Sequence, residues 1–227
     1  MVLKVYGHPL ATNGQRVLIV IEELNVPHEL ITVDFDKMEH KSPEYLAHQP
    51  FGQLPYIEDD GIEIFESRAI CRYLALKYGG IGTLIPAQSD LEKTAKFEQA
   101  ASVELNNFEG PMWQLTWECK YKLFIGLETD VEAAQVHRTR IEGKLDGYEA
   151  MLSKTRFLAG DEVTLVDLFH LPHEAFLKDQ GFDFVTSESS RWPNVARCVS
   201  SICMYRWWKE VTGRPSWQKV ITSVKTN

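Results

Sequence analysis

Glu66 and Ser67 place a carboxylate and a hydroxyl side by side, where alternating apolar residues give way to a helical pattern. A helix start leaves backbone N–H groups without partners in the helix, and such groups favour an anion. These features suit a small zwitterion, with its carboxylate at the N–H groups and its ammonium at Glu66. The same residues also fit an ordinary capped helix after a hairpin.

A β-hairpin must position this corner, which consists of Glu66, Ser67 and the backbone N–H groups of the helix start. Residues 54–57 form a short apolar run, residues 62–65 alternate as a second strand, and Gly61 tolerates positive φ in the turn between them. Pro55 cannot donate to a strand ladder, which predicts an edge position or a cis bond. The helix that follows is predicted from its apolar face, formed by Ile70, Tyr73 and Leu74.

The residues before the hairpin predict a βαβ unit. Residues 2–6 and 28–33 suit strands, and an apolar helix over 16–24 lies between them. Residues 34–47 are polar and predict a loop with a short helix. The order βαβ followed by ββα is that of a thioredoxin-like domain.

From residue 90 onward the apolar residues recur at helical spacing, without a strand pattern. Long helices are predicted over 90–121, interrupted at Gly110–Pro111, and over 131–152. The fold class is therefore α+β. We expect a thioredoxin-like domain over 1–80, a linker over 81–87 and an all-helical domain over 88–227.

Thr164 and Asp167 have the spacing of a capping box, with Val163 and Leu168 as its hydrophobic staple. The helix that they begin is apolar nearly all round, so it should be the buried centre of the second domain. Pro172 should kink or end it. Asp167, His170 and His173 could form a metal-binding face, but buried side chains with hydrogen-bond partners are the favoured interpretation, and no metal is predicted.

Composition limits the classes of partner. The chain has 227 residues, 44% of them hydrophobic, and a formal charge of −8. This charge argues against nucleic acid and anionic membranes, so an anionic ligand would need a local basic spot such as Lys41, Arg16 or Arg68. No apolar run reaches the roughly 18 residues of a membrane-spanning helix, and the N-terminus fits a strand better than a signal peptide.

The four cysteines form no CxxC motif and have no metal-ligand spacing. This pattern favours reduced thiols in an intracellular, cytoplasmic protein over a redox site. They are Cys71, Cys119, Cys198 and Cys203.

Several of these stretches resemble the glutathione S-transferase family. QPFGQLP, the hairpin and FESRAICRY are similar to its glutathione-binding region. KVYGHPLATNGQRVL and the EHK at 39–41 resemble the phi class, and FLAGDEVTLVDLFHLP is similar to the start of the buried helix of its C-terminal domain. The resemblance runs essentially from end to end with the motifs in order.

The resemblance implies a homodimer that uses glutathione as a co-substrate and needs no cofactor. Its thiolate would attack hydrophobic electrophiles or reduce organic hydroperoxides. The implied glutathione contacts are His40 and Lys41 for the glycyl carboxylate, Gln53 and Leu54 beside Pro55 for the cysteinyl part, and Glu66 and Ser67 for the γ-glutamyl part. His40 and Lys41 also fit a solvated charge run.

Two further residues have implied roles. Arg68 would support the glutathione contacts or be a surface charge. Phe51, if exposed, resembles the aromatic key that such subunits insert into a partner; otherwise it is an ordinary core aromatic.

Ala11 departs from the phi-class pattern, in which a serine hydroxyl lies beside the glutathione sulfur. A hydrogen bond to a charged acceptor contributes about 1.5–3 kcal/mol, or about one to two pKa units, so losing it should weaken catalysis. Thr12 and Asn13 are the nearest replacement donors, and Thr12 also fits a plain helix cap. The alternative function is a non-catalytic ligandin for glutathione conjugates or apolar metabolites. A cysteine-based thiol transferase is disfavoured because residues 8–14 contain no cysteine.

The electrophile pocket is expected in an apolar cleft between the domains, although side chains of these types are also common in cores. The candidate lining residues are His8, Leu10, Phe35, Met38, Met112, Trp113, Thr116 and Trp117.

Overall fold

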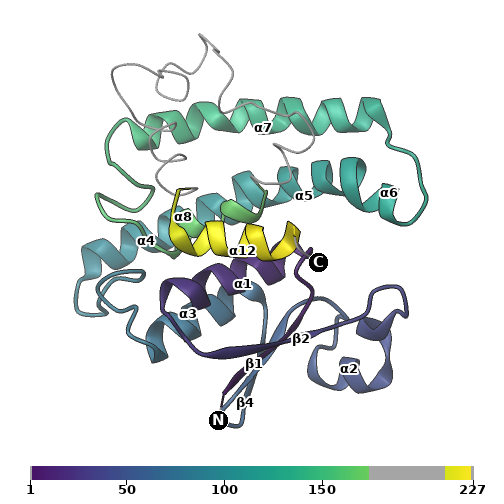
Figure 1. Ribbon diagram of the computed structural model, residues 1–227. Coiled ribbons are helices and arrows are strands. Elements are labelled where there is room, and N and C mark those ends of the chain that lie inside the picture. Colours follow the sequence, from purple (N-terminus) through teal and green to yellow (C-terminus); the bar gives the residue numbers. More distant parts are fainter. Residues whose placement is uncertain (1, 174–212, 226–227) are drawn as a thin grey trace. The chain divides into compact units, whose positions relative to one another are not determined.

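The structure is a computed structural model that describes residues 2–173 and 213–225 (Figure 1). The chain divides into two compact units. One contains Met1–Ile85 together with Arg214–Asn227, and the other contains Pro86–Gly213. The C-terminal segment therefore belongs to the same unit as the N-terminal sheet.

The first unit is built on a four-stranded sheet in the order β2-β1-β3-β4. Strand β1 is parallel to β2 and antiparallel to β3, and β3 is antiparallel to β4. Its strands are β1 (Leu3–Gly7), β2 (His28–Thr32), β3 (Tyr56–Asp59) and β4 (Ile62–Phe65). The predicted βαβ and ββα order is confirmed.

Strand β1 pairs with a strand on each side, and its side chains alternate between the two faces of the sheet. Leu3 and Val5 are buried, whereas Lys4 and Tyr6 are partly exposed. The Leu54–Pro55 peptide bond is cis, which is one of the two predicted arrangements. The apolar run over residues 54–57 predicts that Pro55 lies inside a strand. In the structure β3 begins at Tyr56, so Pro55 lies just before the strand.

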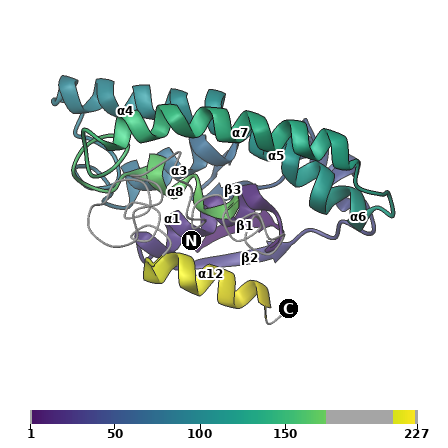
Figure 2. The same ribbon diagram turned by 90° about the horizontal axis from the view of Figure 1, so that it is seen from above.

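Three long helices pack together in this unit. Helix α1 contacts both α3 and α12, and Figure 2 shows α12 running beside α1. Trp217 of α12 is fully buried and its neighbour Ser216 donates a hydrogen bond to Glu23 at the end of α1. The helices of the unit are α1 (Thr12–Glu23), η1 (Glu39–Lys41), α2 (Pro43–His48), α3 (Ser67–Lys77) and α12 (Pro215–Lys225).

The described part of the second unit is helical, as predicted. Consecutive helical segments extend without a break from residue 91 to 124, and α7 runs beside them (Figures 1 and 2). The elements are α4 (Leu91–Val103), a π-helix η2 (Glu104–Glu109), α5 (Gly110–Thr116), a second π-helix η3 (Trp117–Tyr121), α6 (Lys122–Phe124), α7 (Val131–Leu152) and α8 (Leu165–Leu168).

The predicted interruption at Gly110–Pro111 is wrong, because the backbone is helical through both residues; the helix is widened just before them. The chain stays helical but adopts a π-helix over Glu104–Glu109, and α5 resumes at Gly110. Pro111 is the second residue of α5, directly after this π-helix. Single π turns inside helices are frequent at functional sites.

The capping box at Thr164 is confirmed. Asp167 Oδ2 accepts the backbone N–H of Thr164 at 2.8 Å, and Oδ1 accepts that of Leu158 at 3.1 Å. The helix is buried as expected, but its regular part ends at Leu168, before Pro172.

Some predictions fall on residues 174–212, which lie outside the described part of the chain. They concern the thiols of Cys198 and Cys203 and this stretch of the predicted helical domain. In the described part, no helix has the length and apolar character needed to cross a membrane.

Candidate functional site

A short loop leads into α1 and is fixed by its own hydrogen bonds. The backbone N–H of Ala11 donates to the carbonyl of His8 at 3.0 Å, and the N–H of Leu10 donates to His8 Nδ1 at 3.2 Å. Gln15, one turn into the helix, donates from Nε2 to the carbonyl of Pro9 at 2.9 Å. The start of α1 is therefore held in one place.

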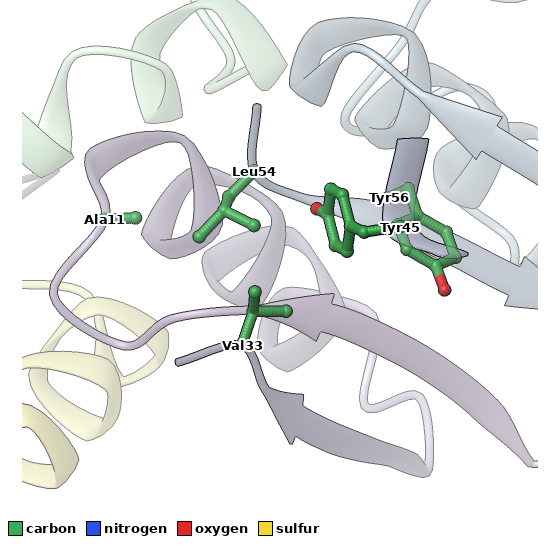
Figure 3. Packing of buried hydrophobic residues seen from close by; sticks show 5 residues of the cluster. All are labelled: Ala11, Val33, Tyr45, Leu54 and Tyr56. Carbon is green, nitrogen blue, oxygen red and sulfur yellow. The ribbon is translucent and has the colours of Figure 1, made fainter. Parts of the chain in front are cut away.

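Ala11 is the N-cap residue of α1, with extended backbone angles and no side-chain cap. Its methyl group belongs to a buried cluster with Val33, Tyr45, Leu54 and Tyr56 (Figure 3). Thr12 begins the helix and is 2% exposed. The first turn therefore offers backbone N–H groups beside an apolar wall, where a serine would have added a hydroxyl.

The start of α3 has an unusual backbone. Glu66 is the exposed N-cap residue with φ of 73°, although it is not a glycine. Such a conformation costs about 1–3 kcal/mol and is concentrated at ligand-binding sites. Ser67 follows it and is buried. The predicted corner of carboxylate, hydroxyl and helix N–H groups is present, with strain added at its centre.

Arg16 joins the first turns of α1 and α3. Its Nη1 donates to Ser67 Oγ at 3.1 Å and also donates to Asn13 Oδ1. Ser67 Oγ and Asn13 Oδ1 are 3.5 Å apart. The structure thus brings together two predicted site residues, Asn13 and Ser67, that are 54 positions apart in the sequence.

The segment that contains η1 and α2 and the loop over residues 51–53 form the next part of the site. Lys41 Nζ donates to the carbonyls of Phe51 at 3.1 Å and Gly52 at 2.8 Å. Tyr45 donates its hydroxyl hydrogen to the carbonyl of Gln53 at 2.8 Å. Lys41 is therefore not part of a merely solvated charge run. Because an ammonium has three donors, it can still bind a carboxylate.

His40 lies in a partly buried position beside Phe35, with 5.0 Å between ring centroids. Its Nδ1 atom is buried and has no hydrogen-bond partner among the described residues. Burial lowers the pKa of His40, and the neighbouring charge of Lys41 lowers it further. His40 therefore favours the neutral form near neutral pH.

The candidate pocket residues belong to both units. In the first, the rings of His8 and Phe35 lie 5.2 Å apart, Leu10 is partly exposed and Met38 is 55% exposed. In the second, Met112 and Thr116 are fully buried, and Thr116 Oγ1 donates to the carbonyl of Met112 at 2.7 Å.

Two tryptophans of the second unit differ from these neighbours. Trp113 is 39% exposed and Trp117 is 36% exposed. Trp113 packs against Tyr121 with 5.3 Å between ring centroids. Along this helix, therefore, only the tryptophans of the candidate set present apolar surface outside the core.

The histidines on the buried helix have hydrogen-bond partners, in agreement with the favoured interpretation. His170 contacts the carbonyl of Val166 through Nδ1 at 2.8 Å and the hydroxyl of Tyr148 through Nε2 at 3.1 Å. His173 Nε2 lies 3.1 Å from Glu109 Oε2. These contacts account for both side chains as parts of the core.

The two described cysteines are free and buried. Burial raises the pKa of Cys71 to about 12. Burial also raises the pKa of Cys119, with a further contribution from Glu118. Because the thiolate is the nucleophile, neither thiol is suited to catalysis.

Two features were not found from sequence reasoning. One is the burial of Arg16, since the sequence indicates only a candidate basic spot there. The other is the return of α12 to the first unit, where Arg214 binds Glu23 and Lys219 binds Glu22. The apolar spacing of Trp217 and Val220 predicts a helix there but does not indicate what it packs against.

Two family profiles match the chain. Glutathione S-transferase, N-terminal domain, matches residues 1–76, and Glutathione S-transferase, C-terminal domain, matches residues 108–215. Glutathione S-transferase PM239X14 of Arabidopsis thaliana is 44% identical over 177 residues, which are 77% of this chain and 81% of that protein. Glutathione S-transferase F11 of the same plant is 39% identical over 221 residues, covering 97% of this chain and 98% of that protein.

Solved structures are similar over nearly the whole length. Glutathione transferase F2 from Populus trichocarpa has a TM-score of 0.85 and 37% identity, covering 99% of this chain and 100% of that chain. Maize glutathione S-transferase I in complex with an atrazine glutathione conjugate also has a TM-score of 0.85, with 30% identity and 99% coverage of both chains.

Proposed function

The chain belongs to the glutathione S-transferase family, in its phi class, and from this premise we propose how it carries out glutathione transfer. It is a glutathione transferase that conjugates glutathione to electrophiles. The observation that carries the site assignment is the joined start of α1 and α3, where Asn13, Arg16 and Ser67 meet. The residue roles below are proposals that this contact and the loop geometry support.

The γ-glutamyl end of glutathione binds at the start of α3. Its carboxylate accepts hydrogen bonds from Ser67 and from backbone N–H groups of the first turn of α3, and its ammonium pairs with Glu66. Glu66 is suited to this role because it is exposed while its backbone is held at positive φ.

The rest of the tripeptide runs along the neighbouring loops. The backbone of Leu54, beside cis-Pro55, and the side chain of Gln53 bind the cysteinyl part. Lys41 supplies positive charge for the glycyl carboxylate, with a donor left after its two carbonyl contacts. His40 lies next to it and contributes a neutral ring N–H.

The glutathione sulfur lies at the start of α1. Ala11 offers no hydroxyl, so the donors are the backbone N–H groups of the first turn and the side chains of Thr12 and Asn13. The positive end of α1 also favours the thiolate. Without a serine, the thiol pKa should stay about one to two units higher than that of a serine-containing site.

The acceptor is a hydrophobic electrophile, and organic hydroperoxides are a second substrate class. His8, Leu10, Phe35 and Met38 supply apolar surface beside the glutathione loops. From the helical unit, the exposed Trp113 and Trp117 are the candidates for contact with the acceptor, and the buried Met112 and Thr116 pack behind them in the core. No cofactor is needed, because glutathione brings the nucleophile.

A ligandin role remains a second candidate because of Ala11. A protein that binds the tripeptide without activating its sulfur could carry glutathione conjugates or apolar metabolites.

We also propose a homodimer that works in the cytoplasm. Phe51 is 64% exposed, and its ring touches Phe65 only edge-on at 6.2 Å between centroids. An exposed aromatic of this kind suits insertion into a partner subunit. The free thiols of Cys71 and Cys119 fit a reducing compartment.

Retention on immobilised glutathione, followed by conjugation of glutathione to a chlorodinitrobenzene acceptor, tests the function. The transferase proposal predicts retention together with a measurable initial rate. Retention with no rate would favour the ligandin, and failure to bind glutathione would contradict both. Ser67→Ala should weaken retention, whereas exchange of the exposed Lys93 by alanine is the matched control and should not.

A further inference from the structure

We propose that Arg16, a fully buried cation, is a positioning residue for the γ-glutamyl carboxylate of glutathione. It orients the Ser67 hydroxyl and adds positive potential beneath the start of α3. This inference rests on the proposed function, because it concerns the same glutathione site.

The burial of Arg16 is costly and therefore informative. Its exposed fraction is 0%. A guanidinium stays charged at all relevant pH values, so its charge cannot be removed by deprotonation when it is buried. Burying such a charge is unfavourable unless hydrogen bonds compensate. Arg16 has such bonds, and two of its acceptors, Asn13 and Ser67, lie at the first turns of two helices.

The direction of these hydrogen bonds determines what Ser67 can do. A guanidinium only donates, so Ser67 Oγ must accept from Arg16 Nη1 at 3.1 Å. The single proton of Ser67 is then left for another acceptor. The available partner, Asn13 Oδ1, is 3.5 Å away, at the outer limit of a hydrogen bond. A ligand carboxylate at the start of α3 would be a stronger acceptor for that proton.

Arg16 also fixes the amide of Asn13. Because the guanidinium donates, the oxygen of the amide faces Arg16 and its NH₂ group faces away. One buried cation thus sets the orientation of a side chain at each helix start. It links the γ-glutamyl contact on α3 to the helix turn proposed to lie beside the sulfur.

The carboxylate is the part of glutathione that this arrangement should affect. The ammonium is assigned to Glu66, and the glycyl end is assigned to Lys41 and His40. Loss of Arg16 should therefore weaken binding of a peptide that has the γ-glutamyl α-carboxylate. It should have little effect on one that lacks it.

Isothermal titration of the full chain with two peptides tests this. One is glutathione, and the other is γ-aminobutyryl-cysteinyl-glycine, which keeps the amine and thiol but has no α-carboxylate. For Arg16→Gln we expect about a tenfold or larger loss of affinity for glutathione and less than about a threefold loss for the analogue. Arg72→Gln, which removes the same charge from α3 five residues after Ser67, is the control and should change neither affinity.

Steady-state kinetics supply a second readout. The KM for glutathione should rise in Arg16→Gln while the KM for the acceptor stays unchanged. If Arg16→Gln does not fold, Arg16→Lys is used instead, because it keeps the charge but loses the guanidinium geometry; the same selective loss is expected.

The failure of this inference differs from the failure of the proposed function. If wild-type protein binds glutathione and the Arg16 variant loses affinity for both peptides equally, Arg16 has a general structural role and the inference is wrong. An unchanged affinity for glutathione would also contradict it. If the wild-type protein binds neither peptide, the proposed function itself fails.

Discussion

Lys41 Nζ lies 2.8 Å from the backbone oxygen of Gly52, so η1, the short helix that carries His40, is tied to the loop that carries Gln53. Gly52 has φ of 57°, and a Cβ at this position would come 2.7 Å from the carbonyl oxygen of His40. The two segments can approach this closely because residue 52 has no side chain.

Gly52→Ala should therefore reduce both stability and glutathione affinity. Positive φ alone costs a residue with a Cβ about 1–2 kcal/mol, and the contact with His40 adds roughly 1–3 kcal/mol. Gly61→Ala is a matched control, because its φ is 84° but a Cβ there would meet nothing within 4 Å. Urea denaturation should show the larger loss for Gly52→Ala, and only this variant should raise the KM for glutathione. Equal losses would contradict the close approach of the two segments.

Two substitutions at Glu66 should separate strain from binding. Glu66→Gly removes a side chain from a backbone at φ 73°, so we expect the free energy of unfolding to rise by about 1–3 kcal/mol while glutathione affinity falls. Glu66→Gln keeps the strain and removes only the charge, so it should lower affinity without raising stability. Thermal denaturation and titration with glutathione check both. A Glu66→Gly variant with unchanged stability would show that the backbone there is not strained.

His40 should make stability depend on pH. Burial and Lys41 lower its pKa in the folded protein below the ordinary value of 6.5. In the pH range between the folded and unfolded pKa values, the unfolded chain binds more protons, so the free energy of unfolding rises with pH there. The contribution is complete above about pH 6.5 and is lost as the pH falls through the folded pKa. Urea denaturation at several pH values across this range should show that the free energy of unfolding rises less steeply with pH in His40→Asn than in the wild type. An identical pH dependence in both proteins would contradict the assignment.

Phe51 should matter for subunit association. It is 64% exposed, so replacing it with alanine removes no core packing and should leave the fold intact. Sizing chromatography with light scattering should show that Phe51→Ala changes from dimer to monomer on dilution at concentrations where the wild type is still a dimer. A dimer that is equally stable in Phe51→Ala would exclude the aromatic key.

Features set by local chemistry were predictable from the sequence. The turn at Gly61 and the capping box of Thr164 and Asp167 each depend on a few adjacent residues, and so does the cis bond at Pro55, which was one of two predicted alternatives. The corner at Glu66 and Ser67 was found for the same reason, although its positive φ was not, because nothing in the side chain of a glutamate indicates it.

Features set by distant contacts were not predictable in this way. Arg16 occurs in a helical pattern that fits an exposed cation, and only the folded chain brings Ser67 to it, 51 positions away. In the same way, Trp217 gives a helical apolar pattern but cannot indicate that α1 is its partner. The family resemblance supplied the roles of His40, Lys41 and Gln53, which have no distinctive local pattern.

The most direct test compares the thiol pKa of bound glutathione in the wild type and in Ala11→Ser, measured by ultraviolet absorbance of the thiolate, with S-methylglutathione affinity as the reference. We predict that both proteins bind S-methylglutathione equally, because Glu66, Ser67 and the loops are unchanged. The thiol pKa should be about one to two units lower in Ala11→Ser. A wild-type protein that binds neither ligand, or a thiol pKa that is the same in both proteins, would contradict the account.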